Sequence, residues 1–116
     1  MKHRKKGRKF GRETKKRKEL LRGLAEALIT RGRIVTTQAK AKSLKPYVEK
    51  IITKSKKNNL ATIRFLASKF NRVLVKKLLG EIGPKFANRS GGYTRIINLP
   101  PRSSDGAKMA IIEFVD

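Results

Sequence analysis

The uneven distribution of charged and apolar residues limits where this chain can build a core. Residues 1–18 contain 11 of the 31 lysines and arginines, one acidic residue and two apolar side chains, Met1 and Phe10. Such a stretch cannot bury enough apolar surface to offset the entropy lost on ordering. We therefore expect a disordered basic tail over residues 1–12 of the free protein, followed by one globular domain over residues 13–116.

From residue 20 onward, regularly spaced apolar residues predict secondary structure. Spacings of three and four predict four helices, whose apolar stripes lie in residues 20–28, 38–57, 60–70 and 74–82. Short β-branched or aromatic runs predict three strands, at residues 33–37, 93–99 and 109–115. The order is helix, strand, three helices, two strands. A small sheet packed on helices buries both sets of apolar faces, so we predict a two-layer α+β fold with a three-stranded sheet and a basic N-terminal extension.

Polar side chains mark where three of the helices are expected to begin. Thr14, Thr37 and Asn71 each precede a helical stripe, and their side-chain oxygens can accept a backbone N–H bond at a helix start. Gly32 is expected to end the first helix in a left-handed conformation.

Proline and glycine predict interruptions in two helices. Pro46 lies inside the second apolar stripe, where it removes a backbone donor, so we expect a kink or a local break. Gly80 or the pair Gly83-Pro84 is expected to end the fourth helix, as a glycine cap followed by proline does. The apolar residues expected to form the third helix are Leu60, Ile63, Leu66, Ala67 and Phe70.

The net charge of +23 restricts the class of partner. Lysine and arginine neutralise phosphates and release condensed counterions, which gives strong, salt-dependent affinity for nucleic acid. Acidic proteins and membrane surfaces are also polyanionic, but a charged tail without a fold of its own favours nucleic acid. Repulsion between the charges predicts a marginally stable monomer outside a complex.

Composition argues against catalysis and against metal binding. The chain has no cysteine and one histidine, His3, whereas a structural zinc site needs four cysteine or histidine ligands. It also lacks a GxxxxGK[ST] phosphate loop, and no two carboxylates lie three or four residues apart on a predicted helix. We expect no enzymatic activity, no metal and no cofactor.

No part of the sequence predicts a membrane or secretory route. The apolar runs are far shorter than the roughly 18 residues that span a bilayer, and the first residues lack the apolar region of a signal peptide. We therefore expect a cytoplasmic protein without a membrane partner.

A glycine pair in the body is a second candidate contact. Gly91-Gly92 is flanked by Arg89, Tyr93 and Arg95. Glycine lets a backbone approach another chain closely, and arginine offers a planar fork to phosphate. The same residues also fit a simple turn at the start of a strand, and Tyr93 also fits a place in the core.

Several short motifs resemble one protein family in their order and spacing. They are Met1-Lys2-His3-Arg4-Lys5, Thr36-Thr37, Lys40-Ala41-Lys42, Gly83-Pro84-Lys85-Phe86, Gly91-Gly92-Tyr93-Thr94-Arg95-Ile96 and Ile112-Glu113-Phe114-Val115. Together they resemble the bacterial large-subunit ribosomal protein seventeen family over essentially the whole chain. One departure is Lys108, which stands where many members have proline.

The resemblance implies a function and a set of contacts. It implies a structural constituent of the large ribosomal subunit, bound to the large (23S) ribosomal RNA near the exit of the peptide tunnel. Other large-subunit proteins, such as the small protein thirty-two, are the implied neighbours. The implied RNA-binding residues are His3, Arg4, Lys5, Arg8 and Arg12 in the tail, Thr36, Thr37 and Lys40 at the strand-to-helix turn, and Arg89, Gly91, Gly92, Tyr93 and Arg95 around the glycine pair.

Two other functions compete with this one on charge alone. A DNA-compacting nucleoid protein needs a symmetric dimer whose arms reach the minor groove, whereas this sequence shows one basic tail and no apolar wedge on a β-arm. A secreted, membrane-active cationic protein would be expected to show a signal peptide or disulfides, and this sequence shows neither. Preference for duplex DNA would favour the first, and leakage of anionic vesicles would favour the second.

Overall fold

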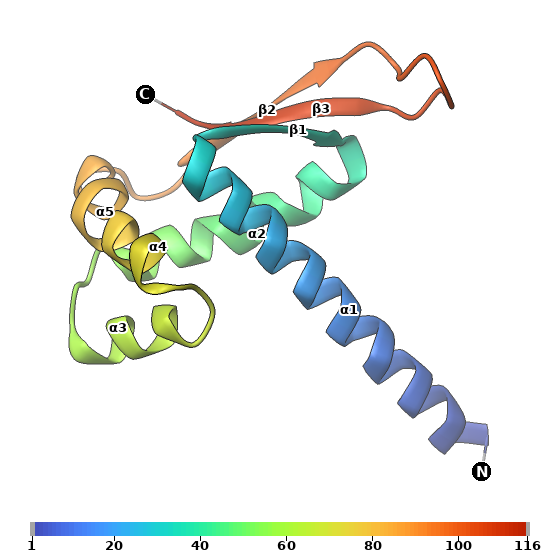
Figure 1. Ribbon diagram of the computed structural model, residues 1–116, viewed down its shortest axis with the longest axis horizontal. Coiled ribbons are helices and arrows are strands. Elements are labelled where there is room, and N and C mark those ends of the chain that lie inside the picture. Colours follow the sequence, from blue (N-terminus) through green and yellow to red (C-terminus); the bar gives the residue numbers. More distant parts are fainter. Residues whose placement is uncertain (1, 116) are drawn as a thin grey trace.

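A three-stranded sheet lies on a layer of helices. The computed structural model describes the backbone of residues 2–115 and the side chains of residues 13–115. Strands β1 (Arg33–Thr37), β2 (Thr94–Leu99) and β3 (Met109–Phe114) form the sheet. Helix α2 (Gln38–Ser55) lies beneath all three strands, and α1 (Lys2–Arg31) passes beside α2 (Figure 1). The predicted α+β class and the three-stranded sheet are confirmed.

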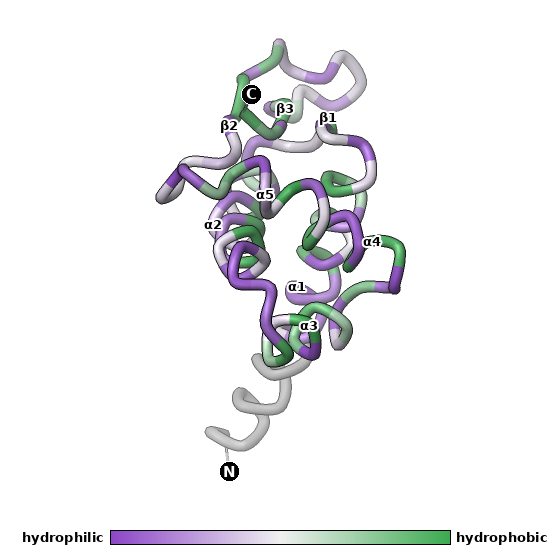
Figure 2. The backbone as a smooth tube through the Cα atoms, turned by 90° about the vertical axis from the view of Figure 1, so that its left-hand side faces the viewer, coloured by the Kyte–Doolittle hydropathy of each residue, from purple (hydrophilic) through white to green (hydrophobic). Residues whose placement is uncertain are grey.

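The remaining helical segments gather around α2 and α1. They are α3 (Leu60–Ala67), α4 (Arg72–Lys77), the π-helical turn η1 (Leu78–Ile82) and α5 (Gly83–Lys85). Figure 2 shows the sheet above this helical layer, in a view turned by 90° from Figure 1. The side chains between the layers form one apolar cluster, which includes Leu28, Val48, Leu78 and Ile112.

The sheet is antiparallel, with the strands in the order β1-β3-β2. Ile34 of β1 pairs with Ile112 of the central strand, and both are buried against the helices. On the opposite face, Val35 is 62% exposed and Ile97 is 41% exposed. One face of the sheet therefore belongs to the core, and the other lies open in the described chain.

The apolar stripe predicted for α2 is confirmed in full. The side chains of α2 that lie buried are Ala41, Leu44, Val48, Ile51, Ile52 and Ser55. The helix continues through Pro46 without a local break. Burial of the whole stripe on both sides of the proline offsets the one backbone hydrogen bond that proline removes.

Three of the predicted helix ends are also confirmed. The Thr37 hydroxyl accepts the Lys40 N–H at 3.3 Å, and the Asn71 side chain accepts the Leu74 N–H at 3.0 Å. Gly32 ends α1 with φ of +81°, in the left-handed region that glycine adopts without strain.

The predicted start of α1 at Thr14 is wrong, because the helix begins at Lys2. The backbone of the predicted tail is therefore helical in the structure rather than irregular. Lysine and arginine are good helix formers, and no proline occurs in the chain before Pro46. The division into a tail over 1–12 and a domain over 13–116 stays a prediction.

The predicted end of the fourth helix is also wrong. The chain continues through Gly80 within η1 and through Gly83 into α5. Gly83 has a helical φ of −56°, so it is not a left-handed cap. A Cβ atom there would lie 2.9 Å from the carbonyl oxygen of Ser55, so glycine at this position permits close packing on the end of α2.

The apolar stripe predicted for the third helix is buried only in part, at Leu66 and Phe70. Leu60 is 61% exposed and Ile63 is 38% exposed, whereas Thr62 and Leu66 are buried. The Asn59 side chain caps α3 by accepting the Thr62 N–H at 2.8 Å. A helix of only eight residues presents a narrow inner face, so only part of the predicted stripe is buried.

Candidate nucleic-acid interface

The residues predicted to bind RNA in the body lie at opposite ends of the sheet. Thr36 pairs with Ala110 at the start of β3, whereas Arg95 pairs with Glu113 near its end. The strand-to-helix turn and the glycine-pair loop (residues 89–95) therefore do not form one patch. They are two separate candidate contacts.

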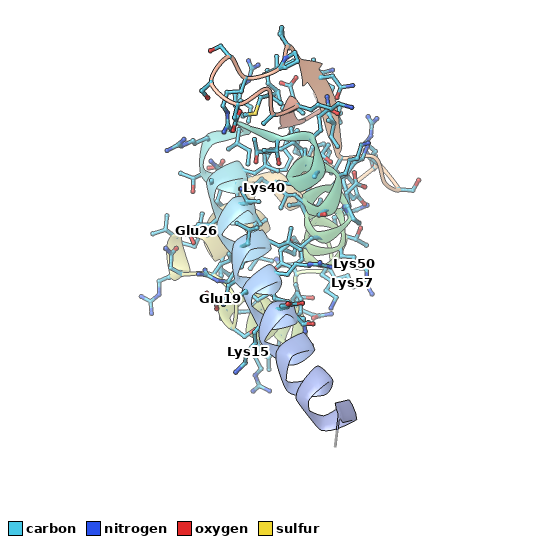
Figure 3. The ribbon with its side chains drawn as sticks, turned by 90° about the vertical axis from the view of Figure 1, so that its right-hand side faces the viewer. Lys15, Glu19, Glu26, Lys40, Lys50 and Lys57 are labelled. Carbon is cyan, nitrogen blue, oxygen red and sulfur yellow. The ribbon has the colours of Figure 1, made fainter. Side chains whose placement is uncertain are left out.

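At the strand-to-helix turn, only one of the three predicted residues presents a charged group to solvent. The Thr36 side chain is buried, and the Thr37 hydroxyl is occupied as the cap of α2. Lys40 is exposed on the first turn of α2, where Figure 3 labels it. The two threonines shape the turn, and Lys40 remains as the candidate for a phosphate contact.

The glycine-pair loop is tied to α2 by one carboxylate. Glu49 Oε2 accepts the Gly92 N–H at 3.0 Å, and Glu49 Oε1 accepts the Thr94 N–H at 3.3 Å and the Thr94 hydroxyl at 3.2 Å. Gly92 has φ of +64°, so its glycine is required by the turn itself. The simple-turn interpretation of Gly91-Gly92 is therefore correct for the fold, whatever the loop contacts outside the chain.

Tyr93 belongs to the core. It is 1% exposed, and its hydroxyl lies 3.2 Å from that of Thr53 and accepts the Lys56 ammonium at 3.1 Å. The hydrogen bond with Thr53 and the adjacent Lys56 lower the pKa of Tyr93, against the opposing effect of burial. Its ring packs 5.2 Å from that of Phe86, so it does not lie open for a base to stack on it.

The two arginines of the loop are exposed but already have partners within the chain. Arg95 Nε lies 3.2 Å from Glu113 Oε1, and the Arg95 side chain is 53% exposed. Arg89 Nε donates to the Gly91 carbonyl at 3.2 Å, and the Arg89 carbonyl accepts the Lys56 ammonium. Any phosphate bound here would compete with these groups or share them.

The predicted tail residues lie on the first turns of α1. His3, Arg4, Lys5, Arg8 and Arg12 fall within the backbone range of that helix. Their side chains lie outside the described residues.

A basic groove along α1 was missed by the sequence analysis. It encloses about 570 Å³ between α1, α2 and the loop that follows α3. Five cations and one carboxylate line it, namely Lys15, Lys16, Lys18, Arg22, Lys69 and Glu19, together with the ring of Tyr47. We call this site the α1 groove.

Part of the α1 groove was visible in the sequence. Lys15, Lys18 and Arg22 are spaced by three and four residues, which places them on one side of a helix. Tyr47 and Lys69 are far away in sequence, so only the packing of α2 and of the α3 loop against α1 reveals them.

The described residues contain neither a metal cluster nor a membrane span. Within the part of the chain that the structure describes, no three histidine, cysteine, aspartate or glutamate side chains gather as metal ligands. Over the same residues, no helix combines the length and the apolar character needed to cross a bilayer.

Comparison with known proteins identifies the family. The family model described as "Ribosomal protein L17" matches residues 20–115. The chain belongs to the ribosomal protein L17 family. It is thus a ribosomal protein and not an enzyme, as the short motifs predicted.

The family resemblance extends beyond the matched range to nearly the whole chain. "Large ribosomal subunit protein bL17" of Nautilia profundicola is 51% identical, covering 99% of this chain and 98% of its own length. The protein of the same name from Gemmatimonas aurantiaca is 50% identical, covering 99% of this chain and 98% of its own length. The one from Thermodesulfovibrio yellowstonii is 49% identical, covering 100% of this chain and 88% of its own length. Both body contacts predicted above lie within the L17 match, whereas residues 1–19 precede it.

Proposed function

We propose that this chain binds large-subunit (23S) ribosomal RNA as a structural constituent of the large ribosomal subunit. The relatives carry the name of that subunit. The charge balance is the observation that carries the RNA-binding step. The chain has 31 basic and 8 acidic residues, and the described side chains form only three ion pairs. Most of the positive charge is therefore free to neutralise phosphates.

The proposed contacts divide into the N-terminal segment and a basic face of the body. In the segment they are His3, Arg4, Lys5, Arg8 and Arg12, and in the body they centre on Lys40, Arg89 and Arg95. Folded ribosomal RNA brings phosphates close together, and cations between its helices relieve the repulsion. Such contacts need no base-specific code, because phosphate positions and RNA shape can direct them. Neighbouring large-subunit proteins near the peptide exit tunnel are the proposed protein partners.

Deletion of residues 2–12 tests the role of the N-terminal segment. The deletion removes seven lysines and arginines, about half of which we expect to neutralise phosphates. The slope of log affinity against log salt should then flatten by roughly two to three units. The body should still fold, because the buried residues of α1 begin at Ala25. Filter binding to transcripts of the RNA over a salt series measures the slope, and circular dichroism checks the fold.

A charge-preserving variant is the matched control for that deletion. Changing Lys2, Lys5, Lys6 and Lys9 to arginine keeps every positive charge and should leave the slope within about half a unit of its original value. An unchanged slope after the deletion would remove the segment from the interface. A clear preference for duplex DNA over the RNA would instead support the nucleoid alternative.

A further inference from the structure

We propose that the α1 groove is an additional RNA-binding site, in which Lys15, Lys18, Arg22 and Lys69 hold the sugar–phosphate backbone of one RNA strand. This inference rests on the proposed function, and it concerns residues outside both predicted body contacts. The first supporting observation is charge. Five cations and a single carboxylate, Glu19, line the groove. A phosphate entering it meets a strong excess of positive charge.

The second observation is that most of these cations have no partner carboxylate. The ion pairs among the described side chains join Arg22 to Glu26, Arg95 to Glu113 and Arg102 to Asp105. Within that described set, Lys15, Lys16, Lys18 and Lys69 take part in none. Binding a phosphate here would break no ion pair of these lysines, in contrast to Arg95 in the glycine-pair loop.

The third observation is that two cations of the groove are held in position. Arg22 Nη1 lies 3.3 Å from Glu26 Oε2 and 3.4 Å from the Lys69 carbonyl oxygen, which links α1 to the loop after α3. The Lys69 ammonium lies 5.3 Å from the centre of the Phe65 ring and 5.7 Å from that of Tyr47. These contacts reduce the conformational entropy that the two side chains would lose on binding.

The fourth observation is the size and lining of the groove. Its volume of about 570 Å³ is within the range of sites for small organic ligands, so it admits a nucleotide unit. Lys15 and Arg22 lie seven residues apart on α1, a rise of roughly 10 Å, so they can face two phosphates of one strand. Tyr47 adds a hydroxyl that makes no hydrogen bond to any described residue. Burial raises the pKa of Tyr47, and the charge of Arg22 opposes this rise, so the hydroxyl stays a proton donor at neutral pH.

Removing three charges from the groove tests this inference. The variant carries Lys15→Gln, Lys18→Gln and Lys69→Gln. Its salt slope for large-subunit RNA should flatten by about two to three units relative to the full chain. The matched control carries Lys42→Gln, Lys50→Gln and Lys57→Gln, three exposed lysines that do not line the groove. Figure 3 shows Lys50 and Lys57 on the other side of α1 from Lys15 and Glu19. The control slope should change by less than about one unit.

A gain-of-affinity variant keeps the test independent of folding. Glu19→Gln removes the one carboxylate of the groove and should tighten RNA binding by about two- to fivefold at low salt. Misfolding would not produce such a gain. A direct check is lysine acetylation of the full chain with and without RNA, in which RNA should protect Lys15, Lys18 and Lys69 but not Lys42, Lys50 or Lys57.

The outcomes separate this inference from the proposed function. Suppose that the full chain binds RNA and that the two triple variants change the salt slope equally or not at all. The α1 groove is then not a specific RNA-binding site, whereas the proposed function of the chain is unaffected. If the full chain does not bind RNA, both proposals fail. If the groove variant loses affinity for poly-glutamate but keeps its affinity for RNA, the groove is a site for an acidic protein, and the inference is overturned.

Discussion

The glycine-pair loop and the α1 groove are both rich in basic residues, but their charged groups differ in what they contact. In the loop, Glu49 accepts three hydrogen bonds, and Arg95 pairs with Glu113. In the groove, Lys15 and Lys18 make no ion pair with the described side chains. A basic residue that is ion-paired within its own chain must share or give up that contact to bind a polyanion, whereas an unpaired one loses no ion pair. Counting lysines and arginines does not distinguish the two.

The largest effect that tests this comparison is on stability. Glu49→Ala should destabilise the fold by about 2 kcal/mol, because Thr94 is 2% exposed and would lose its hydrogen-bond acceptor. The melting temperature followed by circular dichroism should fall by roughly 8 °C. The control is Glu19→Ala in the α1 groove, which should change stability by less than about 0.5 kcal/mol. Equal melting temperatures for the two variants would mean that Glu49 does not hold the loop.

An intermediate effect is expected on RNA binding through Arg95. Glu113→Gln preserves the shape of the side chain but removes the partner of Arg95, so the salt slope should steepen by up to about one unit. Arg95→Ala alone should flatten the slope by about one unit. In the Arg95→Ala background, Glu113→Gln should have little further effect. Equal gains in both backgrounds would contradict the idea that the ion pair restrains Arg95.

The smallest expected effect is a difference between the pH values at which Tyr93 and Tyr47 ionise. The hydrogen bond with Thr53 and the Lys56 ammonium lower the pKa of Tyr93, whereas burial raises the pKa of Tyr47. Tyr93 should therefore ionise at lower pH than Tyr47, as measured by ultraviolet absorbance in Tyr47→Phe and Tyr93→Phe variants. Because the pKa of Tyr93 is lower in the folded than in the unfolded state, its ionisation stabilises the fold at pH values above the unfolded-state pKa of about 10. This contribution is lost as the pH falls through the folded-state pKa. The reverse order of ionisation would show that the Tyr93 hydroxyl lacks these contacts.

Much of the fold could be predicted from sequence where the signal was local. Thr37 and Asn71 cap their helices because a short polar side chain reaches the N–H three residues ahead, which needs no distant partner. The stripe of α2 and the three strands were correct because apolar periodicity directly reflects burial on one face. The motifs around Gly91-Gly92 and at the ends of the chain were sufficient to predict the family.

The candidate sites were less predictable because they depend on the tertiary contacts of each side chain. Gly83 was expected to stop a helix, but its φ is helical and it begins α5. Glycine is needed there because a Cβ atom would lie too close to the carbonyl oxygen of Ser55 at the end of α2. Tyr93 was a candidate surface contact, but its ring completes the core beside Phe86. Lys40 remained exposed, whereas the neighbouring Thr36 side chain faces the interior.

The sequence by itself determined the class of this protein: its family, its α+β order, its large positive charge and the chemistry it excludes. These properties depend on composition and on spacings of a few residues. Only the tertiary structure decided which basic residues are engaged and which are not. Arg95 meets Glu113 across paired strands, and Lys69 meets Tyr47 where α3 and α2 come together beside α1. Such partners lie about 20 residues apart along the chain, and only the packing of the layers brings them together.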